Sequence, residues 1–356
     1  MIPILYDSTE MDFSSNGLGR LRDCISCKVS EGRNDVFECD FEYPVNGQNF
    51  DRIFEGRVIA AQYDDSEDVQ PFDIVSSSKP INGIVKYHAV HISYRQSKLT
   101  VAGTGINSLA SAFSMLAGAQ PGNPFIYETD KEASGYLAAA DGTPRSVKSI
   151  LGGIEGSILD TYGGEYKYNK HIVTLLTSRG ADRGFSIRYG VNLLDYNDDT
   201  NYAESFNACI PYWSGTNSSG GLLIVKGGLV TSNASGYNGR TDCVPLDLTS
   251  KFESQPTAAQ LEAAGAEYMQ SNQTHLPART IKVNFIRLQD SPEYEEYAQL
   301  LECKLCDTVR VVFPRYGMDG KFKIVKTVYN TLTERYEEME LGTLSTTLSQ
   351  ALGLSK

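Results

Sequence analysis

The sequence predicts an α+β fold that is mainly β. Residues 36–43 alternate apolar and acidic side chains, which is the pattern of a strand with one buried and one solvated face. The same period of two returns at 281–285 and at 322–328, where Lys326 interrupts the apolar series. Turn residues cluster between the first strands, as in an antiparallel meander or a small barrel. Both ends of the chain are therefore expected to be rich in β-structure.

Helical patterns are few. One covers 106–117, and a second covers 258–270, with Thr257 in position to begin it. A third, shorter helix is predicted at 292–301. Residues 98–105 include several small side chains and two glycines, so we expect a domain boundary there.

Glycine is concentrated in residues 150–192. There it separates short strand patterns such as 172–176 and 185–189, which indicates tight turns rather than catalytic spacing. The polar segments 214–221 and 231–239 are predicted to be hairpin tips.

Length and charge exclude several classes of function. A chain of 356 residues with 41% hydrophobic content can bury two or three cores. The formal net charge is −12, and no segment gathers enough Lys and Arg to neutralise a row of phosphates, so tight nucleic-acid binding is not expected. Neither a signal peptide nor a membrane span is encoded, so we expect no membrane insertion by the chain itself.

Seven cysteines, an odd number, favour a reducing compartment over a disulfide framework. Two CxxC pairs, Cys24/Cys27 and Cys303/Cys306, could together supply four thiolates to zinc. Both pairs adjoin strand-like apolar runs, and cysteine is commonly a small core residue, so we favour the buried interpretation. No metal and no cofactor are expected.

A dinucleotide-binding fingerprint is imitated where Gly103, Gly105 and Ser108 precede a helix and Glu128 follows about twenty residues later. Ser108 stands in place of the third glycine, and no further βα units follow. A plain strand-to-helix turn is the better interpretation.

Two metal-site patterns also fail on spacing. Residues 195–199 resemble the start of a calcium loop, but Thr200 replaces the required glycine and Phe206 the closing glutamate. His88 and His91 lie three apart in a strand pattern, so they point to opposite faces and do not grip one ion.

Catalytic groups are present without a recognisable motif. His171 and His275 have no serine or cysteine nucleophile in a local motif, although a triad assembled in space stays open. A glycosidase pair is conceivable, but among 44 Asp and Glu such pairs arise by chance. The carboxylates in the glycine-rich segment are Glu155, Asp160, Glu165 and Asp182.

Four tyrosines in or next to short strands suggest either a sugar-stacking platform or an interface. Tyrosine often packs at edges where one end stays wet, so we favour the interface. These residues are Tyr162, Tyr166, Tyr168 and Tyr189.

The chain resembles a known family over nearly its whole length. It is similar to the N-terminal structural region of siphophage tail-tip proteins of the prophage endopeptidase tail, or tail-associated lysin, family. One departure is Val191-Asn192, where the family pattern has Lys before Asn. The carriers of the resemblance are 23–29 with the strand at 36–43, 70–74, 90–94, 151–166, 179–182, 187–190, 334–336 and 340–342.

The resemblance implies a baseplate-hub-like fold with two tail-tube-like β-barrels flanking a mixed α+β domain. On this basis we divide the chain into a first barrel (1–97), a mixed domain (98–199 plus about 256–276), a second barrel (200–255 plus 277–342) and a C-terminal tail (343–356).

The resemblance also implies a function and partners. It predicts a structural hub at the virion tail tip, assembled in the host cytoplasm, in which a homotrimer of pseudo-sixfold character closes the tail tube and opens for DNA ejection. The implied partners are the distal tail protein, the tape-measure protein and the bacterial cell envelope, and DNA passes without specific binding.

Enzymatic activity is not expected, because in longer members of the family the enzyme domains follow the hub region and the residues after Gly342 are too few to form one. We therefore assign no catalytic, cofactor-binding or metal-binding residues. Two alternatives remain: a peptidoglycan-degrading tail enzyme that uses an acidic pair within 155–165, and a module that binds cell-wall glycans as a receptor.

Overall fold

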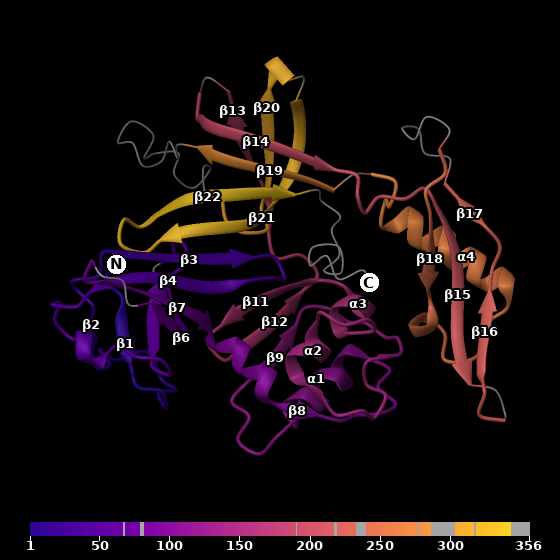
Figure 1. Ribbon diagram of the computed structural model, residues 1–356, viewed down its shortest axis with the longest axis horizontal. Coiled ribbons are helices and arrows are strands. Elements are labelled where there is room, and N and C mark those ends of the chain that lie inside the picture. The colour runs from indigo at the N-terminus through magenta and orange to yellow at the C-terminus, as the bar shows by residue number, and fades with distance from the viewer. Residues whose placement is uncertain are drawn as a thin grey trace.

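A computed structural model shows the chain as several packed modules (Figure 1). The structure describes residues 1–66, 68–78, 82–189, 191–216, 219–232, 240–276, 278–285, 303–316 and 318–342. The expected helix at 292–301 and the tail at 343–356 lie outside these residues. None of the described helices is long and apolar enough to cross a membrane.

The N-terminal lobe (residues 1–98) is a curved antiparallel sheet around an apolar core. The strand expected at 36–43 is confirmed at Phe37–Pro44, where Phe37, Cys39 and Phe41 are buried and the acidic residues between them face outward. The elements are β1 (Ile4–Tyr6), β2 (Gly19–Arg20), β3 (Ser26–Gly32), β4 (Phe37–Pro44), η1 (Phe50–Arg52), β5 (Val58–Gln62), β6 (Val69–Ser78), β7 (Ile84–His91) and η2 (Ile92–Lys98).

The C-terminal lobe combines two stretches of chain. The period-two patterns at 281–285 and 322–328 are both confirmed as strands. Its core holds Phe185, Ile187, Val311 and Ile324. The elements are β13 (Asp182–Arg188), β14 (Leu193–Asn201), β19 (Ala278–Phe285), β20 (Thr308–Phe313), η6 (Pro314–Tyr316), β21 (Met318–Asn330) and β22 (Arg335–Gly342).

One 13-stranded sheet runs through both lobes, in the order β14-β19-β22-β21-β3-β4-β7-β6-β5-β1-β2, with β20 on β21 and β13 on β20. The connection is β21, whose first half pairs with β20 and whose second half pairs with β3. We expected two barrels. Within the described strands the hydrogen bonding instead gives one open sheet, and no closed barrel is found.

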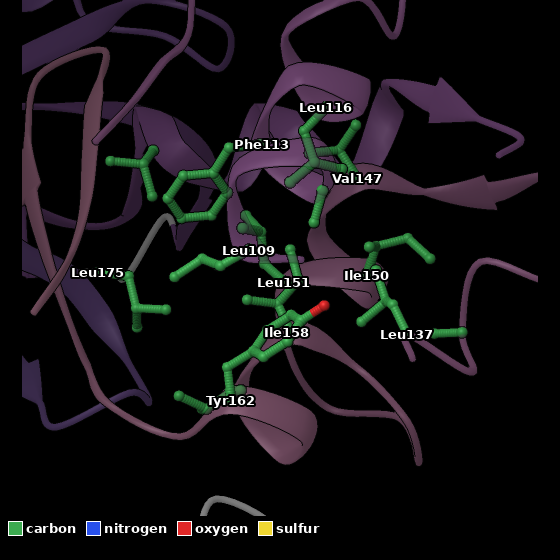
Figure 2. Close-up of a cluster of buried hydrophobic side chains, with 14 of the residues drawn as sticks. Leu109, Phe113, Leu116, Leu137, Val147, Ile150, Leu151, Ile158, Tyr162 and Leu175 are labelled. Carbon is green, nitrogen blue, oxygen red and sulfur yellow. The ribbon is translucent and has the colours of Figure 1, made fainter. Parts of the chain in front are cut away.

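The middle domain (residues 99–177) packs helices on a three-stranded sheet, around the core in Figure 2. The helix expected from residue 106 begins at Leu109. Ser108 caps it, because its side chain accepts the Ser111 N–H while the Ser111 side chain accepts the Ser108 N–H. The elements are β8 (Thr100–Val101), α1 (Leu109–Ala117), β9 (Ile126–Thr129), β10 (Arg145–Ser146), α2 (Val147–Leu151), α3 (Ile158–Tyr162), β11 (Glu165–Asn169) and β12 (Ile172–Leu176).

A side lobe (residues 206–274) projects from the C-terminal lobe (Figure 1). The helix expected at 258–270 is confirmed, with Thr257 and Gln260 forming its capping box. This helix packs on the sheet of the side lobe. The domain division expected from the sequence places residues 256–276 with the mixed domain instead. The elements are β15 (Ala208–Thr216), β16 (Leu222–Lys226), β17 (Val230–Thr231), β18 (Cys243–Asp247), η3 (Thr249–Lys251) and α4 (Ala258–Ser271).

The core of the middle domain yields the first prediction. Leu109 is 1% exposed and is labelled among its neighbours in Figure 2, so Leu109→Ala removes buried methyl groups and leaves a cavity. We expect a loss of about 2–5 kcal/mol in the free energy of unfolding, measured by urea titration. The matched control is Leu222→Ala, because Leu222 is 75% exposed and should change stability by less than about 0.5 kcal/mol. Equal losses in the two variants would contradict the assignment of this core.

Candidate functional site

Five charged side chains are buried where the N-terminal lobe, the middle domain and the C-terminal lobe meet. We name them the junction cluster; each side chain is at most 10% exposed. Two carboxylates therefore face three cations in a place largely closed to water. The members are Glu31, Arg33, Glu165, Arg179 and Lys323.

The geometry of the cluster is that of paired charges with further hydrogen bonds. The Arg179 guanidinium donates to both oxygens of Glu31, at 2.7 and 3.1 Å. Glu165 accepts from the Lys323 ammonium, from Arg33 at 3.5 Å and from the backbone N–H of Arg179 at 2.7 Å. A bidentate pair is the strongest form of such contact, and it fixes orientation as well as distance.

Burial acts to lower the pKa of Arg179, but the facing charge of Glu31 and its hydrogen bonds outweigh it and hold the pKa above its ordinary value. The nearby Cys306 responds in the opposite sense. Burial and then the charge of Glu165 raise the pKa of its thiol to about 12, so it stays protonated and is not a nucleophile at neutral pH.

Gly180 brings the start of β13 against the start of β20. A Cβ atom at Gly180 would lie 1.9 Å from the carbonyl oxygen of Cys306, so only glycine fits. The carboxylate of Asp307 accepts from the backbone of Ala181 at 2.8 Å and from Arg183 at 3.3 Å. Gly180, one of the many glycines in 150–192, therefore allows the backbone of its segment to approach that of Cys306 closely.

A second polar contact joins the N-terminal lobe to the middle domain. His91 is fully buried, with its Nδ1 accepting the N–H of Ser93 at 3.2 Å and its Nε2 3.3 Å from Gln70 Oε1. Gln70 also accepts from the backbone N–H of Lys170 at 2.7 Å. Burial, followed by the positive fields of His171 and other cations, lowers the pKa of His91 well below its ordinary value, so the ring is neutral.

The outward face of β4, β7, β3, β21 and β22 is charged, and we name it the polar sheet face. An open groove of about 470 Å³ crosses its N-terminal part, lined by Ser26, Asp40, Ser76, Lys86 and others. The face carries six carboxylates against three lysines and Arg335. These are Glu38, Asp40, Glu42, Glu337, Glu338 and Glu340, with Lys28, Lys86 and Lys326.

Cross-strand ion pairs order the polar sheet face. Lys86 lies 3.1 Å from Glu42, and Lys28 lies 2.6 Å from Glu337. His88 lies on this face with its Nδ1 2.8 Å from Asp40, while His91 points into the core. The two histidines therefore point to opposite faces, as predicted.

The four carboxylates that could form a glycosidase pair are not assembled into one site. Glu165 belongs to the junction cluster, and Asp182 is exposed and paired with Lys321 at 2.6 Å. Glu155 accepts from Ser250 at 2.9 Å, and Asp160 accepts the backbone N–H of Gly156 at 2.8 Å. Burial, Asp247 and Asp160 raise the pKa of Glu155.

The four tyrosines do not form one platform either. Tyr162 and Tyr166 are buried, at 7% and 4% exposure, and Tyr168 stacks on Tyr166. Only Tyr189 of the four is exposed, at 56%, and it lies in another lobe, stacked on Phe313 at 4.6 Å between ring centroids.

The two CxxC pairs lie in different cores. Cys27 packs in the N-terminal lobe with its sulfur 3.7 Å from that of Cys39, whereas Cys303 and Cys306 pack in the C-terminal lobe. No cluster of three or more metal-ligating side chains occurs within the described part of the chain.

The glycine-rich turn before α1 ends in the Ser108 cap, and Glu128 is exposed on β9. Most side chains of the calcium-loop-like segment 195–200 lie outside the described residues. His171 lies between Phe13 and Phe125, at 6.2 and 5.5 Å between ring centroids.

The sequence patterns missed most of the junction cluster. Glu31 continues the core-facing series of Cys27 and Val29, and Lys323 stands between the apolar residues Phe322 and Ile324. The available sequence signal for a buried ion pair was a charged residue within or between the apolar residues of a strand, because a buried charge requires a partner.

Comparison with solved structures places the fold among prophage tail proteins. The similarity spans almost the whole of each chain, at low sequence identity. Prophage tail protein gp18 from Listeria monocytogenes EGD-e is 15% identical over 99% of both chains, with a TM-score of 0.61. A tail protein from Neisseria meningitidis MC58 is 10% identical, covering 97% of both, with a TM-score of 0.60.

The 43 kDa tail protein of prophage MuSo2 from Shewanella oneidensis is similar to the same degree. It is 10% identical, with 96% of this chain and 98% of that chain covered and a TM-score of 0.59. By sequence, no family model and no curated protein matches. The resemblance to tail-tip proteins is confirmed at the level of the fold.

The junction cluster yields a stability prediction. Glu165→Gln leaves Lys323 and Arg33 buried without their carboxylate, so we expect a loss of about 3–5 kcal/mol in the free energy of unfolding, measured by urea titration. Glu165→Gln/Lys323→Met should recover part of the loss. Asp182→Asn, which breaks the exposed pair with Lys321, is the control and should leave the midpoint unchanged. A Glu165→Gln loss below about 1 kcal/mol would contradict the buried pairing.

His91 predicts an acid-sensitive stability. The unfolded chain binds a proton at this residue near pH 6.5, whereas the folded chain binds it only at lower pH. The free energy of unfolding should therefore fall as the pH drops below about 6.5, by up to about 1.4 kcal/mol per pH unit from this group. Titrations in urea at several pH values should show a shallower slope for His91→Gln. Leu222→Ala, which removes an exposed side chain and no titratable group, should keep the wild-type slope, and equal slopes in all three proteins would refute the prediction.

Proposed function

We propose that this protein is a structural component of a phage or prophage tail, acting as a baseplate hub at the tail tip. The observation that carries the proposal is the fold match over 96–99% of this chain to three prophage tail proteins, each itself covered over 97–99% of its length. Because the likeness spans both lobes, the middle domain and the side lobe, it concerns the whole architecture and not one common motif.

The architecture is consistent with a ring-forming role. The N-terminal and C-terminal lobes are both curved sheets, and they are hydrogen-bonded to each other through β21 and β3. We propose that they correspond to the two tube-like barrels of the hub fold. Three copies would then present six similar lobes around a central opening, which reconciles a trimer with a sixfold tail tube.

The polar sheet face is a candidate lining for that opening. Its six carboxylates outnumber its three lysines and Arg335, and all three lysines are already paired with carboxylates of the face. A trimer has a formal charge of −36, three times the −12 of one chain. A negative, hydrated lining repels the DNA backbone within about a Debye length of 10 Å, so that DNA passes without sticking.

The proposed partners follow from this position. The hub would contact the distal tail protein on the tube side and the tape-measure protein at its centre, and it would lie near the cell envelope during ejection, after assembly in the host cytoplasm. We propose no enzymatic role. Glu165 forms an ion pair with Lys323 and Asp182 forms one with Lys321, so these two carboxylates give no support to a glycosidase pair.

Electron microscopy of the purified protein and of isolated tails tests the proposal. We expect threefold rings with an open centre, and labelling with an antibody against this chain at the tail tip. Absence of the chain from the tail tip would refute the proposal. A zymogram on purified cell walls is the control for the enzymatic alternative, and clearing by the wild-type protein would overturn the non-enzymatic part.

A further inference from the structure

The side lobe contains a long stretch of chain without carboxylates. Residues 205–241 include Lys226 and Arg240 but no Asp or Glu, in a chain that carries 44 acidic residues and a net charge of −12. Strands β15, β16 and β17 all lie within this stretch. Acidic surfaces of two copies repel each other within about a Debye length of 10 Å. These three strands add no negative charge to the surface that they form, so they oppose the approach of a second copy less than the acidic lobes do.

β16 is an edge strand with free backbone groups, and it lies at the outer margin of the side lobe (Figure 1). It pairs with β15 on one side, and no described strand pairs with its other side. The Gly227 N–H bonds to the Pro211 carbonyl oxygen at 2.8 Å, so alternate residues counted back from Gly227 face β15. The N–H and C=O groups of Leu222, Ile224 and Lys226 therefore point out of the sheet, and no described residue bonds to them.

The side chains of these residues lie on the face of the sheet opposite α4. Leu223 and Val225 pack toward the core beneath α4. Leu222 and Ile224 alternate with them, and they are 75% and 56% exposed. An exposed apolar edge with free backbone groups is a template to which another strand can add.

Other edges of the described sheets are protected against such addition. On β13, the Asn192 side chain accepts the Arg188 N–H at 2.8 Å and donates to the Ser186 carbonyl oxygen at 3.1 Å, as a neighbouring strand would. β18 has Pro245 at its centre, which has no N–H to donate, and β2 is only two residues long. β16 has none of these devices, and its one charged residue, Lys226, stands at its end.

We propose that β16 of one copy pairs antiparallel with β16 of a second copy, with the two Ile224 residues opposite each other. An antiparallel edge is complementary to itself, because each outward-pointing residue offers one N–H and one C=O. In this register Leu222 lies opposite Lys226 of the second copy, and the two lysines stay about 14 Å apart, beyond a Debye length. A register centred on Lys226 would instead place the two like charges opposite each other, which destabilises a strand pair.

A second copy fits this edge better than a lipid surface does. Hydrocarbon offers no partner for the free N–H and C=O groups, and leaving them unpaired there is costly. The two cations of residues 205–241 are also too few to hold a nucleic acid tightly. An antiparallel edge pair is two-fold, so it does not lie within one threefold ring. The inference therefore goes beyond the proposed function and concerns pairs of free chains.

Sedimentation velocity of the full chain tests the pairing. Wild type should form pairs as its concentration rises. Ile224→Pro removes the central outward N–H but keeps the bonds to β15, and proline is tolerated where the N–H of an edge strand faces solvent. This variant should pair at least about tenfold more weakly, with the urea midpoint of wild type. Ile224→Thr keeps the N–H and should pair better than Ile224→Pro.

The matched control is Ile126→Thr. Ile126 is 55% exposed, as Ile224 is 56% exposed, but it lies in the middle domain. This variant should pair as wild type does.

Single cysteines test the register. In a hydrogen-bonded pair the Cα atoms lie about 5.5 Å apart, within the range of a disulfide, so Ile224→Cys should link two copies when glutathione disulfide is added. Leu222→Cys places its two sulfurs about 14 Å apart and should not link them. Both variants also carry Cys243→Ser, because Cys243 is an exposed native thiol.

The proposal is overturned by wild type that stays monomeric at about 1 mM or that forms only threefold rings. It is also overturned by a folded Ile224→Pro that pairs like wild type, or by Leu222→Cys that cross-links as fast as Ile224→Cys. If Ile224→Pro loses the wild-type urea midpoint, the two cysteine variants decide. Binding of wild type to phosphatidylglycerol vesicles, without pairs in solution, would overturn the proposal in favour of a lipid contact.

Discussion

The mutual placement of the modules depends on pairing the buried charges of the junction cluster. Glu31 is fixed at the end of β3, Lys323 in the middle of β21, and Glu165 at the start of β11, so the three modules must meet before any of these charges is neutralised. An unpaired charge in such a place costs several kcal/mol. The cluster thus excludes arrangements that the apolar cores alone would tolerate.

The junction cluster lies where β21 changes its neighbouring strand, and this location explains how it fixes the arrangement of the lobes. At Val325 the register of β21 shifts, and there the strand exchanges β20 for β3 as its neighbour, with the Arg33 N–H bonded to the Val325 carbonyl oxygen at 2.8 Å. A slip of β21 by one residue would turn Lys323 to the other face of the sheet. The apolar cores stabilise each module from within, whereas the cluster fixes the register at which two lobes become one sheet.

Local patterns revealed the elements better than their assembly. The alternation at 36–43 and the Thr257 cap were sufficient to place β4 and α4, because burial and capping act within one element. The sequence pattern predicts the start of α1 three residues early, because Ser108 follows a glycine motif in the sequence, whereas in the structure it caps the helix. The junction cluster joins residues up to 158 positions apart, and no periodicity carries that information. The pairing of β21 with β3 is likewise not predictable from local patterns. Two antiparallel meanders have the same sequence pattern whether they form separate sheets or one joined sheet.

The same charges complete the pairing of the sub-sheet formed by β13, β20 and the first half of β21. Arg179 and Lys323 turn inward because Glu31 and Glu165 require them, and the three aspartates of the sub-sheet take three more cations. Of the remaining cations, Arg188 also acts on Asp319, because Arg310 and then Arg188 hold the pKa of Asp319 below its ordinary value. Internal pairing within one copy therefore neutralises most of the positive charge of this sub-sheet.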